Sequence, residues 1–138
     1  MRIIIAGSRD FCDYKLLEAH CTKIIDEFYW QGRITSYMDL SSLEIISGTA
    51  RGADQLGEKF ARDRNFDICR MPANWDIDGK SAGYKRNEKM AQYASKDDGV
   101  LIAFWDGKSK GTKHMIDIAK KYKLQVFVIR FDQEKNNE

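Results

Sequence analysis

The sequence predicts an α/β fold in which a mainly parallel sheet of about five strands is covered by helices on both faces. Short apolar runs rich in β-branched residues alternate with segments of helical periodicity along almost the whole chain, as in successive strand–helix–strand units. The run GVLIAF at 99–104 is apolar throughout, as expected for a central parallel strand buried on both faces. The 138 residues fit one domain, and no linker divides them.

Each element is predicted from its own pattern. Strands are expected at 2–6, 43–47, 66–71, 99–104 and 125–130, and helices at 13–31, 53–64, 82–95 and 111–122. Asp13 is placed to cap the first helix, and Tyr84 is expected to face inward from the third. The stretch 32–42 is the least regular, and 73–81 is interpreted as a polar loop carrying Trp75. We therefore expect a single domain over 1–130, followed by a polar, frayed tail over 131–138.

The composition excludes several classes of protein. Lys and Arg number 23 against 21 Asp and Glu, a net charge of +2, which gives no general electrostatic case for nucleic acid or a membrane surface. No segment approaches the roughly 20 apolar residues of a membrane span, and the start of the chain turns polar too early for a signal peptide. Cys12, Cys21 and Cys69 lack CxxC spacing, and neither His20 nor His114 has a metal-binding partner four residues on. We expect a cytoplasmic protein with reduced thiols and no metal.

Unusual loops follow four of the five predicted strands. In an open parallel sheet these loops share the carboxyl edge, where ligands bind. The loop GTARGAD at 48–54 opens a helix, so Gly48 and Gly52 allow a sharp turn and a close approach, and the free N–H groups of the helix start favour an anion. The spacing GxxxG matches neither a Walker A loop nor a GxGxxG motif, and a plain strand-to-helix turn explains it equally well.

The other loops strengthen the prediction of an anion site. WDGKSKGT at 105–112 is a second glycine-rich connection, with lysines among its glycines. Arg9, next to Ser8, can bind a phosphate or carboxylate with its guanidinium fork, although a surface salt bridge is the common alternative. Trp75 and Trp105 can either stack on a base or pack under a loop.

Four ordered motifs together resemble the SLOG superfamily, and most closely its small stand-alone YspA-like branch. The motifs are GSRDF, SGTARGADQLGEKFA, PANWD…GKSAGYKRNEKM and AFWDGKSKGTKHMIDIA, and the resemblance covers 2–130. It implies a Rossmann-like three-layer sandwich with a pocket for a nucleotide or nucleotide-derived ligand. Carried over by position, with Trp105 added, the candidate ligand-binding residues are Gly7, Ser8, Arg9, Gly48, Gly52, Ala53, Asp54, Glu58, Arg86, Asn87, Trp105, Asp106, Gly111 and Thr112.

The same resemblance bears on catalysis. Related LOG-type phosphoribohydrolases carry a PGGxGTxxE motif with a catalytic Glu, and Met115 stands at that position here. A thioether cannot stabilise an oxocarbenium-like transition state or activate water as a carboxylate does, so this activity is not inherited by motif. Asp54 and Glu58 are the remaining candidate catalytic carboxylates, although binding ribose hydroxyls or capping a helix fits them better.

Three functions follow, in decreasing order of preference. The first is a module that binds a nucleotide-derived small molecule, with no other cofactor expected. The second is a hydrolase or transferase acting on an N-glycosidic or phosphoester bond of a nucleotide. The third is binding of single-stranded DNA, as in DprA-type relatives, which the near-neutral charge disfavours. The resemblance also implies a dimer or larger homo-oligomer, and the aromatic cluster Phe28, Tyr29 and Trp30 is either an interface or core.

Overall fold

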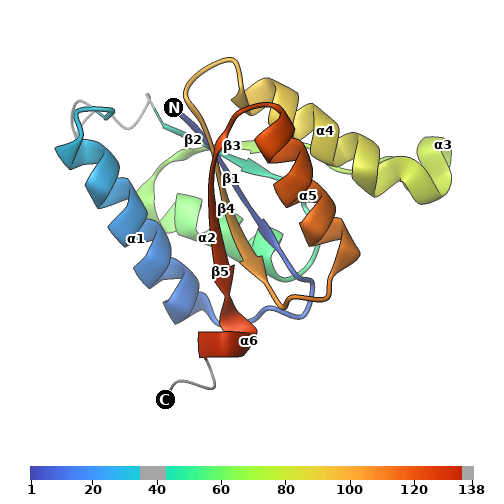
Figure 1. Cartoon of the computed structure of the whole chain (residues 1–138), viewed down its shortest axis with the longest axis horizontal. Helices are drawn as coiled ribbons and strands as arrows, with labels where there is room; N and C mark the ends of the chain where they lie inside the picture. The colour runs from blue at the N-terminus through green and yellow to red at the C-terminus, as the bar shows by residue number, and fades with distance from the viewer. Residues whose placement is uncertain (35–42, 135–138) are drawn as a thin grey trace.

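The computed structural model describes residues 1–34 and 43–134. Its centre is a five-stranded sheet of order β3-β2-β1-β4-β5, in which all neighbouring strands run parallel (Figure 1). The strands are β1 (Arg2–Gly7), β2 (Glu44–Ser47), β3 (Asp67–Arg70), β4 (Gly99–Trp105) and β5 (Gln125–Arg130). All five overlap the predicted strands, and the predicted parallel sheet is confirmed.

Helices cover both faces of the sheet, which confirms the three-layer α/β class. Helices α1 (Tyr14–Trp30) and α2 (Ala53–Arg64) pack on one face, and α4 (Ala82–Ala94) and α5 (Lys110–Lys121) pack on the other (Figure 1). Side chains alternate along β1, since Ile3 and Ile5 join the core under α1 and α2 while Ile4 joins the core under α4 and α5. Asp13 caps α1 as predicted, and its Oδ1 accepts the N–H of Leu16 at 3.1 Å.

Two segments that were predicted to be irregular contain short helices in their described residues. The expected polar loop at 73–81 contains α3 (Trp75–Asp78) and a single 3-10 turn, η2 (Gly79–Ser81). Helix α3 begins because the Asn74 side chain accepts the N–H of Ile77 at 3.2 Å. The expected frayed tail begins with α6 (Phe131–Glu134), and Phe131 is buried with its ring centroid 4.9 Å from that of Phe11. The buried Phe131 ring anchors this short helix. The polar composition of the tail gave no indication of it.

The aromatic residues at the end of α1 differ in their exposure. At the end of α1, Phe28 is core while Trp30 is 80% exposed, so the aromatic cluster is not one buried unit. Of the irregular stretch at 32–42, residues 35–42 lie outside the described part of the chain, as do 135–138 of the tail. No helix within the described ranges has the length and apolar character needed to cross a membrane.

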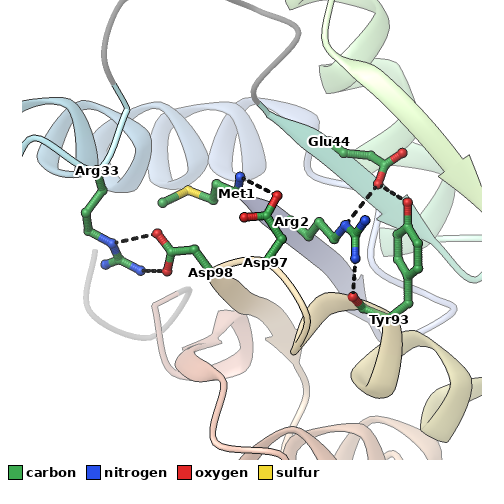
Figure 2. A network of polar contacts seen from close by, with 7 residues as sticks. All are labelled: Met1, Arg2, Arg33, Glu44, Tyr93, Asp97 and Asp98. Carbon is green, nitrogen blue, oxygen red and sulfur yellow. Dashed lines mark hydrogen bonds and ion pairs between the residues drawn. The ribbon is translucent and has the colours of Figure 1, made fainter.

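A network of hydrogen bonds and ion pairs joins polar side chains near the amino ends of the strands. Figure 2 shows its members, which are Met1, Arg2, Arg33, Glu44, Tyr93, Asp97 and Asp98. Arg2 donates to the backbone oxygen of Tyr93 at 2.7 Å and lies 3.6 Å from Glu44 of β2. Arg33 forms a two-bonded pair with Asp98, just before β4, at 2.7 and 3.2 Å. The charged side chains of this network are therefore paired with one another.

Candidate functional site at the carboxyl edge of the sheet

A cleft of about 540 Å³ opens at the carboxyl ends of β1 and β4, which are the strands between which the strand order reverses. Volumes of about 300–1,000 Å³ are usual for small-molecule sites. The loops after β1, β2 and β4 and the segment before and within α4 supply its walls. The lining residues with chemistry to offer are Ser8, Arg9, Asp10, Arg51, Asp54, Trp75, Lys80, Tyr84, Arg86, Asn87, Asp106, Ser109 and Thr112.

The loop after β1 joins the two central strands at the cleft. The backbone N–H of Ser8 donates to the backbone oxygen of Phe104 at 2.9 Å, and the Ser8 hydroxyl accepts the N–H of Asp106 at 3.2 Å. Ser8 is thus buried and positions backbone. Arg9 next to it is exposed, and it forms no hydrogen bond or ion pair with the described residues. Its guanidinium is available to a ligand.

The loop after β2 packs closely against the loop after β1. Gly52 has φ +83°, and a Cβ there would lie 2.5 Å from the backbone oxygens of both Ser8 and Arg9. Only glycine fits this approach in this conformation. The N–H of Ala53 then donates to the oxygen of Ser8 at 3.3 Å. Gly52 and Ala53 hold the two loops together rather than line the cleft.

Asp54 places a buried carboxylate in the wall of the cleft. It lies in the first turn of α2 and accepts the N–H of Ala50 at 3.1 Å. Burial raises the pKa of Asp54 to about 6, against the opposing effects of Arg86 and the Ala50 hydrogen bond. This carboxyl therefore exchanges a proton near neutral pH, as a general acid or base does.

Arg86 reaches from α4 to the same point. Its Nη1 donates to the backbone oxygen of Gly48 at 2.6 Å and its Nε donates to Oδ1 of Asn87 at 3.0 Å. A Cβ on Gly48 would lie 2.7 Å from this Nη1 and 2.8 Å from Oδ2 of Asp54. A side chain at position 48 would therefore have to displace the guanidinium or the carboxylate from its present position. Burial lowers the pKa of Arg86, and Arg9 lowers it further, while Asp54 raises it.

The loop after β4 is held in shape by its own side chains. Asp106 Oδ1 accepts the N–H groups of Lys108 and Ser109, each at 2.8 Å. Burial opposes charge on Asp106, but these hydrogen bonds keep its pKa below the usual value. Ser109 caps α5 by accepting the N–H of Thr112 at 3.3 Å. The start of α5, with its favourable dipole for anions, therefore faces a fixed loop at the cleft.

Asn87 ties α4 to the start of α5. Its Nδ2 donates to the backbone oxygen of Gly111 at 3.3 Å and lies 3.1 Å from Nδ1 of His114. Asn87 and Thr112 are buried, whereas Gly111 is exposed with no atom within 4 Å of a Cβ built on it. Met115 forms part of the floor with Ala6 and Met90 and is itself buried in the core.

Five of the fourteen candidate residues do not line this cleft, and these are Gly48, Gly52 and Ala53 of the loop after β2 together with Glu58 and Trp105. Glu58 accepts the Ser47 hydroxyl at 2.6 Å and pairs with Nε of Arg70 at 2.7 Å, and it is absent from the cleft lining. Trp105 packs under its loop, where its Nε1 donates to the oxygen of Ser109 at 3.1 Å. Trp75 does line the cleft.

Sequence reasoning missed several lining residues, of which Tyr84 is the clearest. It was expected to face inward, yet it is 48% exposed and lines the cleft. Tyr84, Asn87 and Ala91 lie on one stripe of α4, with Asn87 and Ala91 buried. Tyr84 lies in the first turn of α4, which borders the cleft, and it therefore faces the cleft instead of the core. Asp10, Arg51, Lys80 and Ser109 also line the cleft, and no sequence pattern distinguished them from ordinary loop residues.

Comparison with known proteins identifies the family of the chain. A family model described as YspA, cpYpsA-related SLOG family matches residues 1–77. The chain belongs to this SLOG family. It is also similar to the gene 61 protein of Mycobacterium phage D29, with 33% identity over 110 residues that cover 70% of this chain and 86% of the phage protein. No solved structure matches it.

The residues matched by the SLOG family model include only some of the residues that line the cleft. The matched residues 1–77 contain Arg9, the loop after β2 with Asp54, and Trp75. Arg86 and the start of α5 lie beyond the match and are brought to the same cleft by the fold. SLOG membership indicates a nucleotide-related or LOG-related function in general terms, without specifying ligand or reaction.

Proposed function

We propose that this chain binds a nucleotide or nucleotide-derived molecule through its phosphate, as a sensor, carrier or sequestering protein. The observation that carries the proposal is the convergence of Arg9 and Arg86 in one cleft that also contains the start of α5. The two guanidiniums are near enough for Arg9 to disfavour the charged form of Arg86, and Asp54 offsets only part of their charge. A phosphate would complete this arrangement, since guanidiniums and helix starts both bind it well.

Arg9 offers the sharpest test because its exposed side chain forms no hydrogen bond or ion pair with the described residues. We expect a panel of nucleoside monophosphates, dinucleotides and cyclic nucleotides to contain ligands that raise the melting temperature at millimolar concentration. Arg9→Ala should weaken such a ligand at least tenfold, the effect of losing a charged hydrogen bond of about 1.5–3 kcal/mol. Arg62→Ala, which removes an exposed arginine of α2 outside the cleft lining, is the matched control. If no member of the panel stabilises the protein, the proposal is wrong.

A second function, cleavage of an N-glycosidic or phosphoester bond of a nucleotide, is favoured by Asp54. Its carboxyl lines the cleft and has a pKa raised to about 6, which suits proton transfer near neutral pH. Incubation with nucleoside monophosphates or NAD, followed by chromatography, should then reveal products that Asp54→Asn abolishes. Glu58→Gln is the control, because Glu58 is bonded to Ser47 and Arg70 outside the cleft. Product formation that survives Asp54→Asn would exclude this role for Asp54.

A further inference from the structure

Two large aromatic side chains are exposed within the cleft instead of being buried in the core. Trp75, the first residue of α3, is 51% exposed, and Tyr84 in the first turn of α4 is 48% exposed. Both line the cleft that contains Arg9 and Arg86. Exposed aromatic surface is unfavourable in water, so its presence in a concave site is consistent with a ligand that covers it.

Tyr84 packs against a side chain of the neighbouring helix. Its ring stacks on the ring of His114, with centroids 4.2 Å apart and planes inclined by 28°. His114 Nδ1 is 3.1 Å from Nδ2 of the buried Asn87. Burial lowers the pKa of His114 and so favours the neutral ring, whose unprotonated nitrogen can accept a hydrogen bond. A planar ligand could therefore pack on the part of the Tyr84 ring that His114 does not cover.

Trp75 lies beside the proposed phosphate site. A Cβ on Gly83 would lie 3.6 Å from Cη2 of the Trp75 ring and 3.8 Å from Nη2 of Arg86, so the indole and the guanidinium approach the same glycine. Trp75 also lines a smaller hollow of about 250 Å³ together with Arg9, Gly48 and Arg86. Aromatic surface and phosphate-binding cations are therefore continuous in this part of the cleft.

We propose that Trp75 and Tyr84 form a nucleobase subsite, so that the ligand is an intact nucleoside phosphate whose base stacks on these rings while its phosphate binds Arg9 and Arg86. This inference rests on the proposed function and names the class of ligand for that site. A sugar phosphate or pyrophosphate would use the cations and leave the aromatic surface uncovered. Every nucleobase has a planar face that can stack. The subsite is therefore expected to favour nucleoside phosphates over sugar phosphates that lack a base.

The test compares ligands with and without a base on the full chain. AMP, GMP, CMP, UMP and ribose 5-phosphate are titrated calorimetrically into the wild type, Trp75→Ala and Trp30→Ala. Trp30 is the matched control, because it is 80% exposed at the end of α1 and does not line the cleft. We expect at least one nucleoside monophosphate to bind roughly fivefold or more tightly than ribose 5-phosphate. Trp75→Ala should abolish that preference without changing the affinity for ribose 5-phosphate, and Trp30→Ala should leave both affinities unchanged.

The other outcomes separate this inference from the proposed function. Equal affinity for ribose 5-phosphate and all four nucleotides overturns the base subsite while leaving phosphate binding intact. A Trp75→Ala variant that weakens ribose 5-phosphate and nucleotides by the same factor also overturns it, since the side chain would then shape the whole cleft. Absence of binding by all five ligands overturns both the subsite and phosphate binding at Arg9 and Arg86.

Discussion

Asp54 is an acidic side chain in surroundings that disfavour its charge. Its folded-state pKa, raised to about 6 by burial, exceeds the ordinary value of 3.8. Between these two values the folded state binds more protons than the unfolded state, so stability falls as pH rises from about 4 to 6 and stays lower at pH 7. This difference in pKa corresponds to a loss of about 3 kcal/mol in the free energy of unfolding when Asp54 is ionised. A destabilising charge kept in a cleft is consistent with a functional role.

Replacing Asp54 with asparagine should therefore stabilise the protein at neutral pH. Asn retains an oxygen that can accept the N–H of Ala50 and carries no charge, so we expect Asp54→Asn to raise the free energy of unfolding at pH 7 by about 1–3 kcal/mol. The gain should shrink towards zero at pH 4, where wild-type Asp54 is protonated in the folded state. Urea denaturation at pH 4, 5.5 and 7 measures this, and equal or lower stability of the variant at pH 7 would contradict it.

Asp63 supplies a control, because its substitution by asparagine should change stability in the opposite direction. A hydrogen bond from the Tyr14 hydroxyl and another from Lys59 lower the pKa of Asp63. Its charged form therefore contributes stability that is present above its unfolded pKa and is lost as pH falls through the folded value. Asp63→Asn should lower stability at pH 7, with a difference that disappears in acid. Two aspartates of one chain should thus respond to the same substitution in opposite directions.

Individual site residues were predicted unevenly from the sequence. Gly48 and Gly52 stood out because glycine between a strand and a helix marks a special turn, and both are indeed points of close approach. The atoms that approach Gly48 come from Arg86, 38 residues away, and no local pattern contains that information. Glu58 fitted a binding role by its distance from Asp54 along α2, but its actual partner, Arg70, belongs to β3.

At the scale of elements, the loops after β1 and β2 act as one unit because Gly52 lets their backbones touch. Gly52→Ala would place a Cβ 2.5 Å from two backbone oxygens at φ +83°, where neither the backbone atoms nor the dihedral angle can relax cheaply. We expect a loss of about 2–4 kcal/mol in unfolding free energy and weaker ligand binding as the loops separate. Chemical denaturation and ligand titration measure the two effects.

Gly111→Ala is the matched control for this prediction. Gly111 lies in the first turn of α5 without positive φ, and a Cβ there meets no atom within 4 Å. Alanine should therefore leave stability unchanged or raise it by up to about 1 kcal/mol through its helix propensity. If Gly52→Ala proved as harmless as Gly111→Ala, close contact between the two loops could not be what Gly52 provides.

Helices and strands were predicted well where their periodicity extends over several turns or pairs. The helix predicted at 53–64 has those bounds in α2, and β5 has the bounds predicted at 125–130. Short elements were missed, because α3 and α6 depend on one cap or one buried ring. Asn74 caps the former and Phe131 anchors the latter, and such single contacts leave no repeat in the sequence.

At the scale of the molecule, the arginines of the cleft differ from those at the amino ends of the strands in whether they form ion pairs. At the amino ends, Arg2 and Arg33 are paired with acidic groups (Figure 2). At the carboxyl ends, Arg9 has no such partner among the described residues, and Arg86 bonds to a backbone oxygen and an amide. The sequence predicted which edge carries the loops, since the carboxyl ends of parallel strands share one edge. It did not predict this difference, because ion pairing depends on which distant segments meet.

The position of β1 in the middle of the sheet has a consequence for how the chain folds. β1 pairs along its length with β4, so that Arg2 lies opposite Gly99. The apolar strand Ile3–Ile5 precedes most of the chain yet acquires its second neighbour only when that distant segment arrives. Contacts of such long sequence range slow folding and leave an apolar edge open to aggregation in the meantime. The first strand of the sequence therefore has neighbours on both sides only when β4 is also in place.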